Sequence, residues 1–317
     1  MAEPTDQIVI GIDVGGTKIR GLAFESNDPD AIVAESRIDT PHGTDALVEA
    51  LLETVRRLEQ APGTPVGLGI AGLVDRSGRF LVGPNLPGVI DAPLCAILTE
   101  ALDGPVAVVN DASAAAWAEY KVGAGQGSGD FVMVTLGTGI GGGFIFDGLL
   151  FTGARGFAAE IGHMVVDPGG LECPCGRMGC WERYASGVGL GRMARERALD
   201  DGVVGAVDLA GGDPGAVKGE HVTAAAAAGD DEALAVLDGF SDWLALGLAN
   251  LVAILDPDRI VLGGGVISAH DLFVAPTQRR LDQVLMEAEH RPGVPIVPAA
   301  LGPEAGAVGA GLFAAEA

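Results

Sequence analysis

Residues 7–26 read QIVIGIDVGGTKIRGLAFES, two apolar runs rich in β-branched residues on either side of a Gly/Thr turn. Such runs indicate strands, and adjacent glycines permit a tight turn. Backbone N–H groups in this kind of turn can point at an anion, and the Thr17 hydroxyl adds a donor. Asp13 is available to hold Mg²⁺ through water. The candidate nucleotide-binding residues here are Asp13, Gly15, Gly16, Thr17 and Lys18.

A second segment, DFVMVTLGTGIGGGFIFDG at residues 130–148, repeats this arrangement. A glycine-rich hairpin alone is more often only a tight turn, but two similar turns at equivalent points favour a polyphosphate held from both. A further glycine cluster follows the strand-like RIVL and precedes a helical start at Ser268, which suits an adenosine group. The candidate residues are Gly137, Thr138, Gly139, Gly263, Gly264 and Gly265.

The remaining periodicity indicates an α/β chain in two halves. Apolar runs predict strands at residues 32–40, 65–72 and 105–111, and helical patterns cover residues 44–59 and about 25 residues from near Asp230. Each half opens with a strand, a Gly/Thr turn and a second strand, so we expect two related α/β domains with a cleft between them. The expected domains are residues 1–110 with 302–317, and residues 111–301.

Composition excludes several classes of protein. The 317 residues include 48% hydrophobic and 20% charged ones, enough for a large core. With a formal net charge of −24 and three scattered lysines, there is no basic footprint for nucleic acid. The start MAEPTDQ has no signal segment, and the apolar stretch at residues 243–255 is too short to span a membrane. We expect a soluble, cytoplasmic protein that binds neither membrane nor nucleic acid.

Residues 172–182, ECPCGRMGCWE, hold three cysteines within eight positions, ten residues after His163. Three thiolates and one imidazole make a Cys₃His set typical of structural zinc, and glycines between the cysteines permit tight knuckles. The alternative is a redox or buried set of cysteines, which the absence of a secretory segment disfavours. The fourth cysteine, Cys95, lies in an apolar run and is interpreted as a core residue. The candidate zinc ligands are His163, Cys173, Cys175 and Cys180.

Two groups of polar residues are candidates for the chemistry. Asn110 and Asp111 end the strand PVAVVND just before a helical run, so they should emerge at the carboxyl end of a strand. Asp111 is the candidate general base, although an N-cap is an equally simple role for it. Glu160 and His163 would be neighbours if their segment is helical, and Glu182 follows the cysteines. Together these three could bind a polyol, whereas each glutamate alone could be a surface charge.

These motifs together resemble the ROK family of sugar kinases, sugar-responsive repressors and uncharacterised proteins. DVGGTKI, GIAGLVD, PNLPG, VNDASAAA, LGTGIGGG, the EIGH segment, the cysteine run and LGGGVI occur in the family order along essentially the whole chain. One departure is Ala159, where family members often have glycine before the glutamate, and it could alter the pocket backbone.

The resemblance implies an actin-like, ribonuclease H-like two-domain α/β fold with the active site in the interdomain cleft. It also implies ATP and Mg²⁺ as cofactors, a structural Zn²⁺, transfer to the 6-hydroxyl of a hexose with Asp111 as base, and a homo-oligomer, dimer or tetramer. Glucose is the expected sugar, because chain length and motif set most resemble the ATP-dependent glucose kinases of the family. The implied sugar-binding residues are Gly72, Asn85, Asn110, Asp111, Glu160, His163 and Glu182.

Three alternatives stay open at this point. Pocket residues of this kind could serve fructose, mannose or an N-acetylhexosamine. Polyphosphate is a rival donor, although the −24 charge argues against a groove for a polyanion. A sugar-sensing regulator would need a DNA-binding module, and the phosphate turn begins as early as Asp13, which disfavours one.

Overall fold

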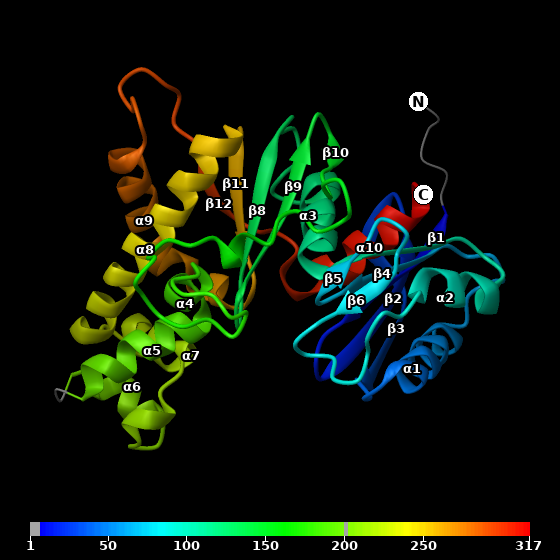
Figure 1. The fold of residues 1–317 in the computed structure, drawn as a ribbon, viewed down its shortest axis with the longest axis horizontal. Coiled ribbons are helices and arrows are strands. Elements are labelled where there is room, and N and C mark those ends of the chain that lie inside the picture. The colour runs from blue at the N-terminus through cyan, green and yellow to red at the C-terminus, as the bar shows by residue number, and fades with distance from the viewer. Residues whose placement is uncertain (1–6, 200–201) are drawn as a thin grey trace. The chain divides into compact units, whose positions relative to one another are not determined.

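The computed structural model describes residues 7–199 and 202–317. The chain divides into two compact units (Figure 1). The first comprises Met1–Gly129, Gly143–Ala159 and Ala300–Ala317, and the second comprises Asp130–Gly142 and Glu160–Ala299. The chain therefore crosses between the units four times, and the second unit's segments fall inside the sequence of the first.

The first unit contains a mixed sheet in the strand order β3-β2-β1-β4-β7. Its strands are β1 (Ile8–Val14), β2 (Lys18–Glu25), β3 (Asp28–Asp39), β4 (Val66–Ile70) and β7 (Val106–Asn110). β1 pairs antiparallel with β2 across the Gly/Thr turn and parallel with β4, which pairs parallel with β7. The strands expected from the sequence are confirmed, and the three parallel ones end at the same edge.

Helices cover this sheet. They are α1 (Thr44–Arg57), α2 (Leu94–Leu102), α3 (Asp111–Val122) and α10 (Ala305–Ala315); short strands β5 (Leu73–Val74) and β6 (Phe80–Val82) pair beside them. Leucines of α1 and α2 enter the core. α10 packs against β1 and β4 at glycines, since a Cβ on Gly11 or Gly67 would lie 1.8 or 1.7 Å from a carbonyl oxygen of that helix. α3 packs on α10, so α3 lies in the first unit although the expected boundary preceded it.

A second sheet has the order β10-β9-β8-β11-β12. Its strands are β8 (Phe131–Leu136), β9 (Ile140–Phe146), β10 (Leu149–Leu150), β11 (Arg259–Gly263) and β12 (Ile296–Pro298). β8, β11 and β12 are parallel, and β9 runs antiparallel to β10. The strand–turn–strand unit expected at residues 130–148 is confirmed, and β9 continues from the second unit into the first.

Helices of the second unit are α4 (Glu182–Ala185), α5 (Gly187–Ala198), α6 (Val204–Leu209), α7 (Gly219–Ala227), α8 (Asp231–Leu255) and α9 (His270–Val284). Short 3₁₀ turns cover Ile161–His163, Pro214–Ala216, Gly265–Ala269 and, in the first unit, Gly302–Glu304. The helix expected near Ser268 begins at His270, because a 3₁₀ turn precedes it.

Helix α8 is the 25-residue helix that the sequence predicts, and Asp230 caps it by accepting from the Ala233 N–H at 2.9 Å. By length and composition α8 could span a bilayer, yet half of its apolar window is buried. Phe240, Leu244 and Leu248 are fully buried, and α8 lies beside α9 (Figure 1). These contacts are those of a core helix in a globular domain.

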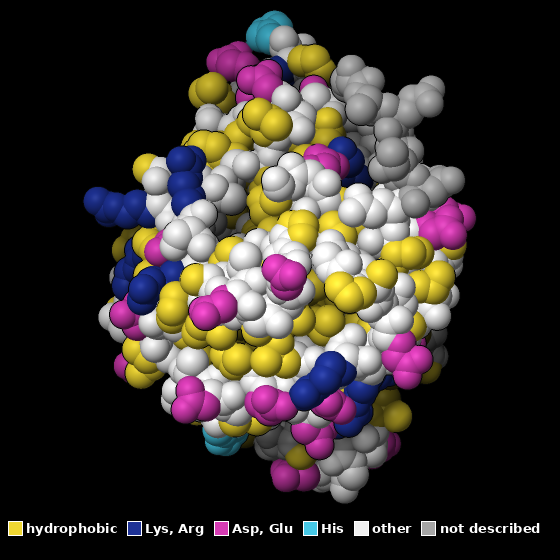
Figure 2. Space-filling view, turned by 90° about the vertical axis from the view of Figure 1, so that its right-hand side faces the viewer, with side chains coloured by type: hydrophobic (Ala, Val, Ile, Leu, Met, Phe, Trp, Pro, Cys, Tyr) yellow, Lys and Arg dark blue, Asp and Glu magenta, His cyan; other side chains and the backbone are white. Residues whose placement is uncertain are grey.

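The excess of acid is distributed rather than concentrated on the visible face of the molecule. Figure 2 shows Asp and Glu side chains spread over that face among apolar and polar groups, with Lys and Arg between them. Many of the basic groups in the described residues pair with acids, for example Arg56 with Glu49 and Arg57 with Glu53. Such exposed pairs contribute little to stability, and interspersed charge of this kind favours solubility.

Candidate active site

The carboxyl ends of β1, β4 and β7 bring the predicted site residues of the first unit together. Val14 is in register with Ile70, and Ile70 with Asn110. Asp13 therefore lies next to the end of β1, while Asn110 ends β7 and Asp111 follows it. Ligands of parallel α/β sheets bind at such carboxyl ends, so this edge stays the predicted position of the site.

Asn110, rather than Asp111, caps helix α3. The Asn110 Oδ1 accepts from the N–H groups of Ala112 at 2.9 Å and Ser113 at 3.1 Å, and its Nδ2 donates to the Gly72 carbonyl at 3.2 Å. Asp111 is the first residue of α3 and is half-buried. Burial raises the pKa of Asp111, while a hydrogen bond from the Ala112 backbone lowers it in part. The sequence allowed Asp111 to be either the general base or the helix cap. The structure gives the cap to Asn110.

Asp13 has an unusual electrostatic environment. Burial, and then the charge of Asp111, raise the pKa of Asp13 to about 6, against a smaller opposing effect of Arg20. The carboxyl packs against Gly306, where an added Cβ would lie 3.1 Å from its Cγ. A pair of carboxyls that resist simultaneous ionisation is a favourable place for a divalent cation, which removes the repulsion.

The turn after Asp13 packs on the PNLPG segment. A Cβ on Gly16 would lie 2.7 Å from the Asn85 Cβ, so glycine allows these two segments to meet. Two other members of the predicted set are exposed. Thr17 lies on the surface, and Lys18 pairs with Asp39 of β3. Lys18 therefore lies with β3 rather than with Asp13.

In the second unit, His163 and the three cysteines of residues 172–182 converge. Their candidate ligand atoms all lie within 4.8 Å of one another. The Cys175 and Cys180 sulfurs are 3.5 Å apart, and the Cys173 sulfur is 3.8 Å from the His163 Nδ1. In a zinc tetrahedron with Zn–S near 2.3 Å, two sulfurs lie about 3.8 Å apart. The donor set and the spacing therefore fit a zinc ion, with Nδ1 as the histidine donor.

The backbone around this cluster depends on glycine and on one buried tryptophan. Gly176 and Gly179 have φ of 87° and 73°, and a Cβ on Gly179 would lie 1.6 Å from the Asp167 carbonyl oxygen. Trp181 is fully buried and donates from Nε1 to the Trp243 carbonyl at 2.8 Å, which fixes the loop to α8. The expected role of the two glycines in tight knuckles is confirmed.

Glu182 contacts the cluster directly. Its Oε1 lies 3.2 Å from the Cys173 sulfur and 3.6 Å from the His163 Nδ1. Burial raises the pKa of Cys173 to about 12, so a metal that binds its thiolate must displace the proton. The side chains of Glu182 and His163 are 20% and 32% exposed, so both stay accessible to a small ligand.

Glu160 and His163 are close along the chain without lying on an α-helix. Glu160 precedes a single 3₁₀ turn that ends at His163, and the His163 N–H donates to the Glu160 carbonyl at 3.1 Å. Ala159, just before Glu160, has φ of 69°. This left-handed conformation favours glycine, which explains why family members often have glycine where this chain has Ala159. Ala159 is also the last residue before the chain enters the second unit.

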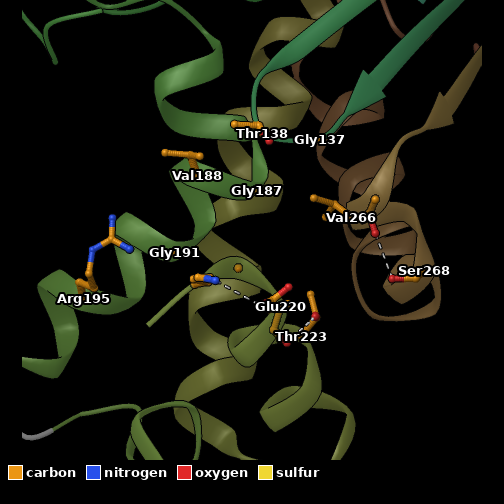
Figure 3. A pocket seen from close by; sticks show the side chains of 13 residues that line it. Gly137, Thr138, Gly187, Val188, Gly191, Arg195, Glu220, Thr223, Val266 and Ser268 are labelled. Atoms are coloured by element: carbon orange, nitrogen blue, oxygen red, sulfur yellow. Dashed lines mark hydrogen bonds and ion pairs between the residues drawn. The ribbon is translucent and has the colours of Figure 1, made fainter. Parts of the chain in front are cut away.

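A cavity of about 500 Å³ lies within the second unit (Figure 3). The predicted residues Gly137, Thr138 and Gly265 line it, and Val188 and Val266 lie on opposite sides of it. Gly263 instead packs against Met133 in the core, while Gly264, with φ of 84°, packs on Leu136. Sequence reasoning missed the rest of the lining: Gly187, Val188, Gly191, Arg195, Lys218, Gly219, Glu220, Thr223, Val266 and Ser268.

The missed lining has one signal in the sequence, the glycine spacing of residues 187–191. A Cβ on Gly187 would lie 2.9 Å from the Gly137 carbonyl oxygen, and one on Gly191 would lie 2.9 Å from the Gly219 nitrogen. A Cβ on Gly219 would in turn meet the Gly187 oxygen at 2.6 Å. The glycines of α5 therefore let the turn at Gly137 and the start of α7 approach that helix closely.

Residues 9–317 match the model of the ROK family. The chain belongs to the ROK family. It is 38% identical to a glucokinase of Streptomyces coelicolor over 98% of both chains. It is also 37% identical to an N-acetylmannosamine kinase of Citrobacter koseri over 81% of this chain and 83% of that one.

Among solved structures, the chain resembles a ROK family glucokinase of Streptomyces griseus in complex with glucose and AMPPNP. The TM-score is 0.86 and the identity 37%, over 98% of this chain and 100% of that one. The protein therefore has the two-domain α/β fold of the ROK sugar kinases, which is actin-like. The fold expected from the sequence is confirmed.

Proposed function

We propose that this protein is a glucokinase that transfers the γ-phosphate of ATP to the 6-hydroxyl of glucose. The observation that carries the proposal is the position and burial of the Asp111 carboxyl. Its carboxyl lies at the carboxyl end of β7, half-buried, and Asn110 rather than Asp111 caps the helix that follows. A carboxylate at this edge that is not the cap of the following helix suits proton removal from a substrate hydroxyl.

In the proposed reaction, Asp111 accepts the proton of the 6-hydroxyl as its oxygen attacks phosphorus. A buried carboxylate has a raised pKa, which brings its basicity closer to that needed for proton transfer near neutral pH. Mg²⁺ and backbone donors would stabilise the charge on the transferred group, and Asp13 is the proposed partner of Mg²⁺ through water. With Asp111 removing the proton and Mg²⁺ stabilising the charge, the reaction needs no second base.

Sugar recognition is assigned to the polar groups that the family resemblance implies. These are Gly72, Asn85, Asn110, Asp111, Glu160, His163 and Glu182. A structural zinc ion bound to the His163 Nδ1 would leave Nε2 of the same ring for a sugar hydroxyl. Carboxylates that accept from paired hydroxyls discriminate strongly, because a substrate lacking one leaves a buried acceptor unpaired.

The nucleotide is assigned to the cavity of the second unit. The turn of Gly137 and Thr138 offers N–H groups and a hydroxyl for phosphates, and Val188 and Val266 offer apolar contacts for a base. A volume of about 500 Å³ is adequate for a nucleotide-sized ligand. Since ATP is the proposed donor, the cytoplasm is the proposed compartment.

N-acetylmannosamine is the second candidate substrate, because kinases of that sugar are similar to this chain at 37% identity. That similarity covers 81% of this chain, against 98% for the glucokinases at 38%, which is why glucose comes first. A sugar-sensing regulator without catalysis is the remaining class. It would not require the carboxyls of Asp13 and Asp111.

The test is a coupled assay of purified protein with ATP and Mg²⁺ on glucose, fructose, mannose, N-acetylglucosamine and N-acetylmannosamine. The assay is repeated with polyphosphate as donor, and the zinc content of the dialysed protein is measured. We expect the highest kcat/KM on glucose with ATP, and one zinc per chain. A higher kcat/KM on N-acetylmannosamine would make that sugar the substrate in place of glucose. Sugar binding without turnover on any sugar would make the protein a sensor.

A further inference from the structure

The carboxyl group of Glu182 lies between the cysteine cluster and the second phosphate turn. Its Oε1 is 3.2 Å from the Cys173 sulfur and 3.6 Å from the His163 Nδ1. Its Oε2 lies against Gly139, because a Cβ built on that glycine would be only 2.5 Å from Oε2. A single side chain therefore touches both the metal ligands and the turn proposed to hold phosphate, which lies far earlier in the chain.

Space, and not backbone conformation, requires glycine at position 139. The glycines with φ in the left-handed region do not include Gly139. Gly137, at the other end of the same turn, also lies outside that region, but a Cβ there would meet nothing within 4 Å. The two glycines thus differ in one respect, which is that the missing side chain of Gly139 leaves room for a carboxylate oxygen.

The residues after Gly139 keep the EIGH segment in contact with the turn as well. A Cβ on Gly162 would lie 2.2 Å from the Ile140 carbonyl oxygen, so the 3₁₀ turn that ends at His163 packs on the start of β9. The end of β8, the start of β9, the 3₁₀ turn and Glu182 therefore form one packed group within the second unit. A displacement of the turn at Gly139 would therefore move the side chains of His163 and Glu182.

We infer that Gly139 is a positioning residue: its missing side chain leaves the space that Oε2 of Glu182 occupies, and so holds that carboxylate in place for the sugar. The inference rests on the proposed function, which assigns Glu182 to sugar binding. It adds that Gly139 belongs to the proposed phosphate turn and also contacts the proposed sugar ligand Glu182, so a methyl group at position 139 changes recognition of the sugar.

Gly139→Ala is the discriminating substitution. The atom it displaces is the free end of a flexible side chain, so the fold can persist while the carboxylate moves. We expect the variant to keep its zinc content and its thermal midpoint within a few degrees. Glucose affinity, measured by calorimetry without nucleotide, should fall about 10- to 100-fold, the usual loss when a charged hydrogen bond to a ligand is removed.

Gly137→Ala is the matched control, because it adds the same methyl group to the same turn in open space. Its glucose affinity, measured in the same way, should equal that of the wild type, whatever the methyl group does to ATP binding. Glu182→Asp supplies a second arm. Its shorter side chain already withdraws the carboxylate from Gly139, so Gly139→Ala should cause no further loss in that background.

The outcomes separate the inference from the proposed function. If the wild type binds no hexose, the proposed function fails before Gly139 is tested. If the wild type binds glucose and Gly139→Ala binds within twofold of it, the inference is overturned and the proposed function stands. Loss of zinc in Gly139→Ala, or an equal loss of affinity whether or not Glu182→Asp is also present, would overturn the inference too, since the effect would not run through the carboxylate.

Discussion

The carboxyls of Asp13 and Asp111 lie at the carboxyl ends of β1 and β7, the two parallel strands that flank β4 in the first unit. Burial, and then the charge of Asp111, raise the pKa of Asp13 from 3.8 to about 6. The folded state therefore disfavours the charged form of Asp13. Its cost to stability is absent below about pH 4, grows between about pH 4 and 6, and is fully present above about pH 6.

Asp13→Asn should consequently stabilise the metal-free protein at about pH 7.5. The gain should be about 1–3 kcal/mol, allowing for partial solvent screening of a half-buried group. In urea unfolding, the advantage of the variant over the wild type should shrink as the pH is lowered from about 7.5 to 5. Turnover should be lost because the proposed Mg²⁺ partner is gone. An advantage that is constant over this pH range would contradict the assigned pKa.

Asp111→Asn should reduce kcat by about 10²- to 10⁴-fold while glucose affinity changes only a few-fold. The amide is nearly isosteric and keeps a hydrogen-bonding group at the edge of β7, but it cannot accept the proton. Because burial raises the pKa of Asp111, wild-type kcat should also fall on the acid side, as this carboxyl becomes protonated. Single-turnover kinetics separate the chemical step from binding. Ordinary turnover in the variant would rule out Asp111 as the base.

Cys175→Ser should lose zinc and glucose affinity together, since Cys175 is one of the four converging donors and His163 is both donor and proposed sugar contact. Cys95→Ser is the matched control, a cysteine outside the cluster whose sulfur donates to the Val106 carbonyl at 3.2 Å. Metal analysis and calorimetry measure the two properties. Zinc loss with unchanged glucose affinity would show that the metal does not organise the sugar site.

Much of this arrangement is local in sequence and could be predicted. The strand, Gly/Thr turn and strand of residues 7–26 and 130–148 follow from apolar patterning and glycine, and the cysteine spacing of residues 172–182 defines its own ligand set. In each case the residues that interact lie within about 20 positions of one another, so spacing alone constrains them.

What could not be predicted depends on tertiary packing. The contact of Gly139 with Glu182, and the lining of the cavity by residues at the start of α7, join segments far apart in the chain. The choice between Asn110 and Asp111 as the cap of α3 depends on which side chain turns back over the helix end. Composition and periodicity carry no information on these contacts.

Ala159 gives a prediction at one crossing between the units. Its φ of 69° costs a residue with a Cβ about 1–2 kcal/mol. Ala159→Gly relieves that strain but gains freedom in the unfolded chain, so its free energy of unfolding should lie within about 1 kcal/mol of the wild type. Ala159→Val should destabilise by more than about 1 kcal/mol, because β-branched residues are least tolerant of this conformation. Urea unfolding of both variants measures the difference. Equal stability of the two variants would mean that position 159 is not left-handed in solution.

Glu119 is fully buried in α3, and backbone groups from two chain segments satisfy it. Its Oε2 accepts from the N–H groups of Ala124 at 2.8 Å and Ala300 at 3.1 Å, and its Oε1 accepts from Leu301 at 2.9 Å. Ala300 begins the last segment of the first unit. The carboxylate therefore joins the end of α3 to the chain as it returns from the second unit.

Glu119→Gln should destabilise the protein by about 2–4 kcal/mol, because either orientation of the amide turns an N–H₂ donor toward a backbone N–H donor and leaves a buried group unpaired. Glu316→Gln is the matched control. It changes an exposed glutamate that pairs with Lys121 near the end of α10, and it should alter stability by less than about 1 kcal/mol. Urea unfolding of the two variants at neutral pH measures the difference. Similar stabilities would mean that the three backbone contacts do not need two acceptor oxygens at position 119, whereas a loss confined to Glu119→Gln would show that they do.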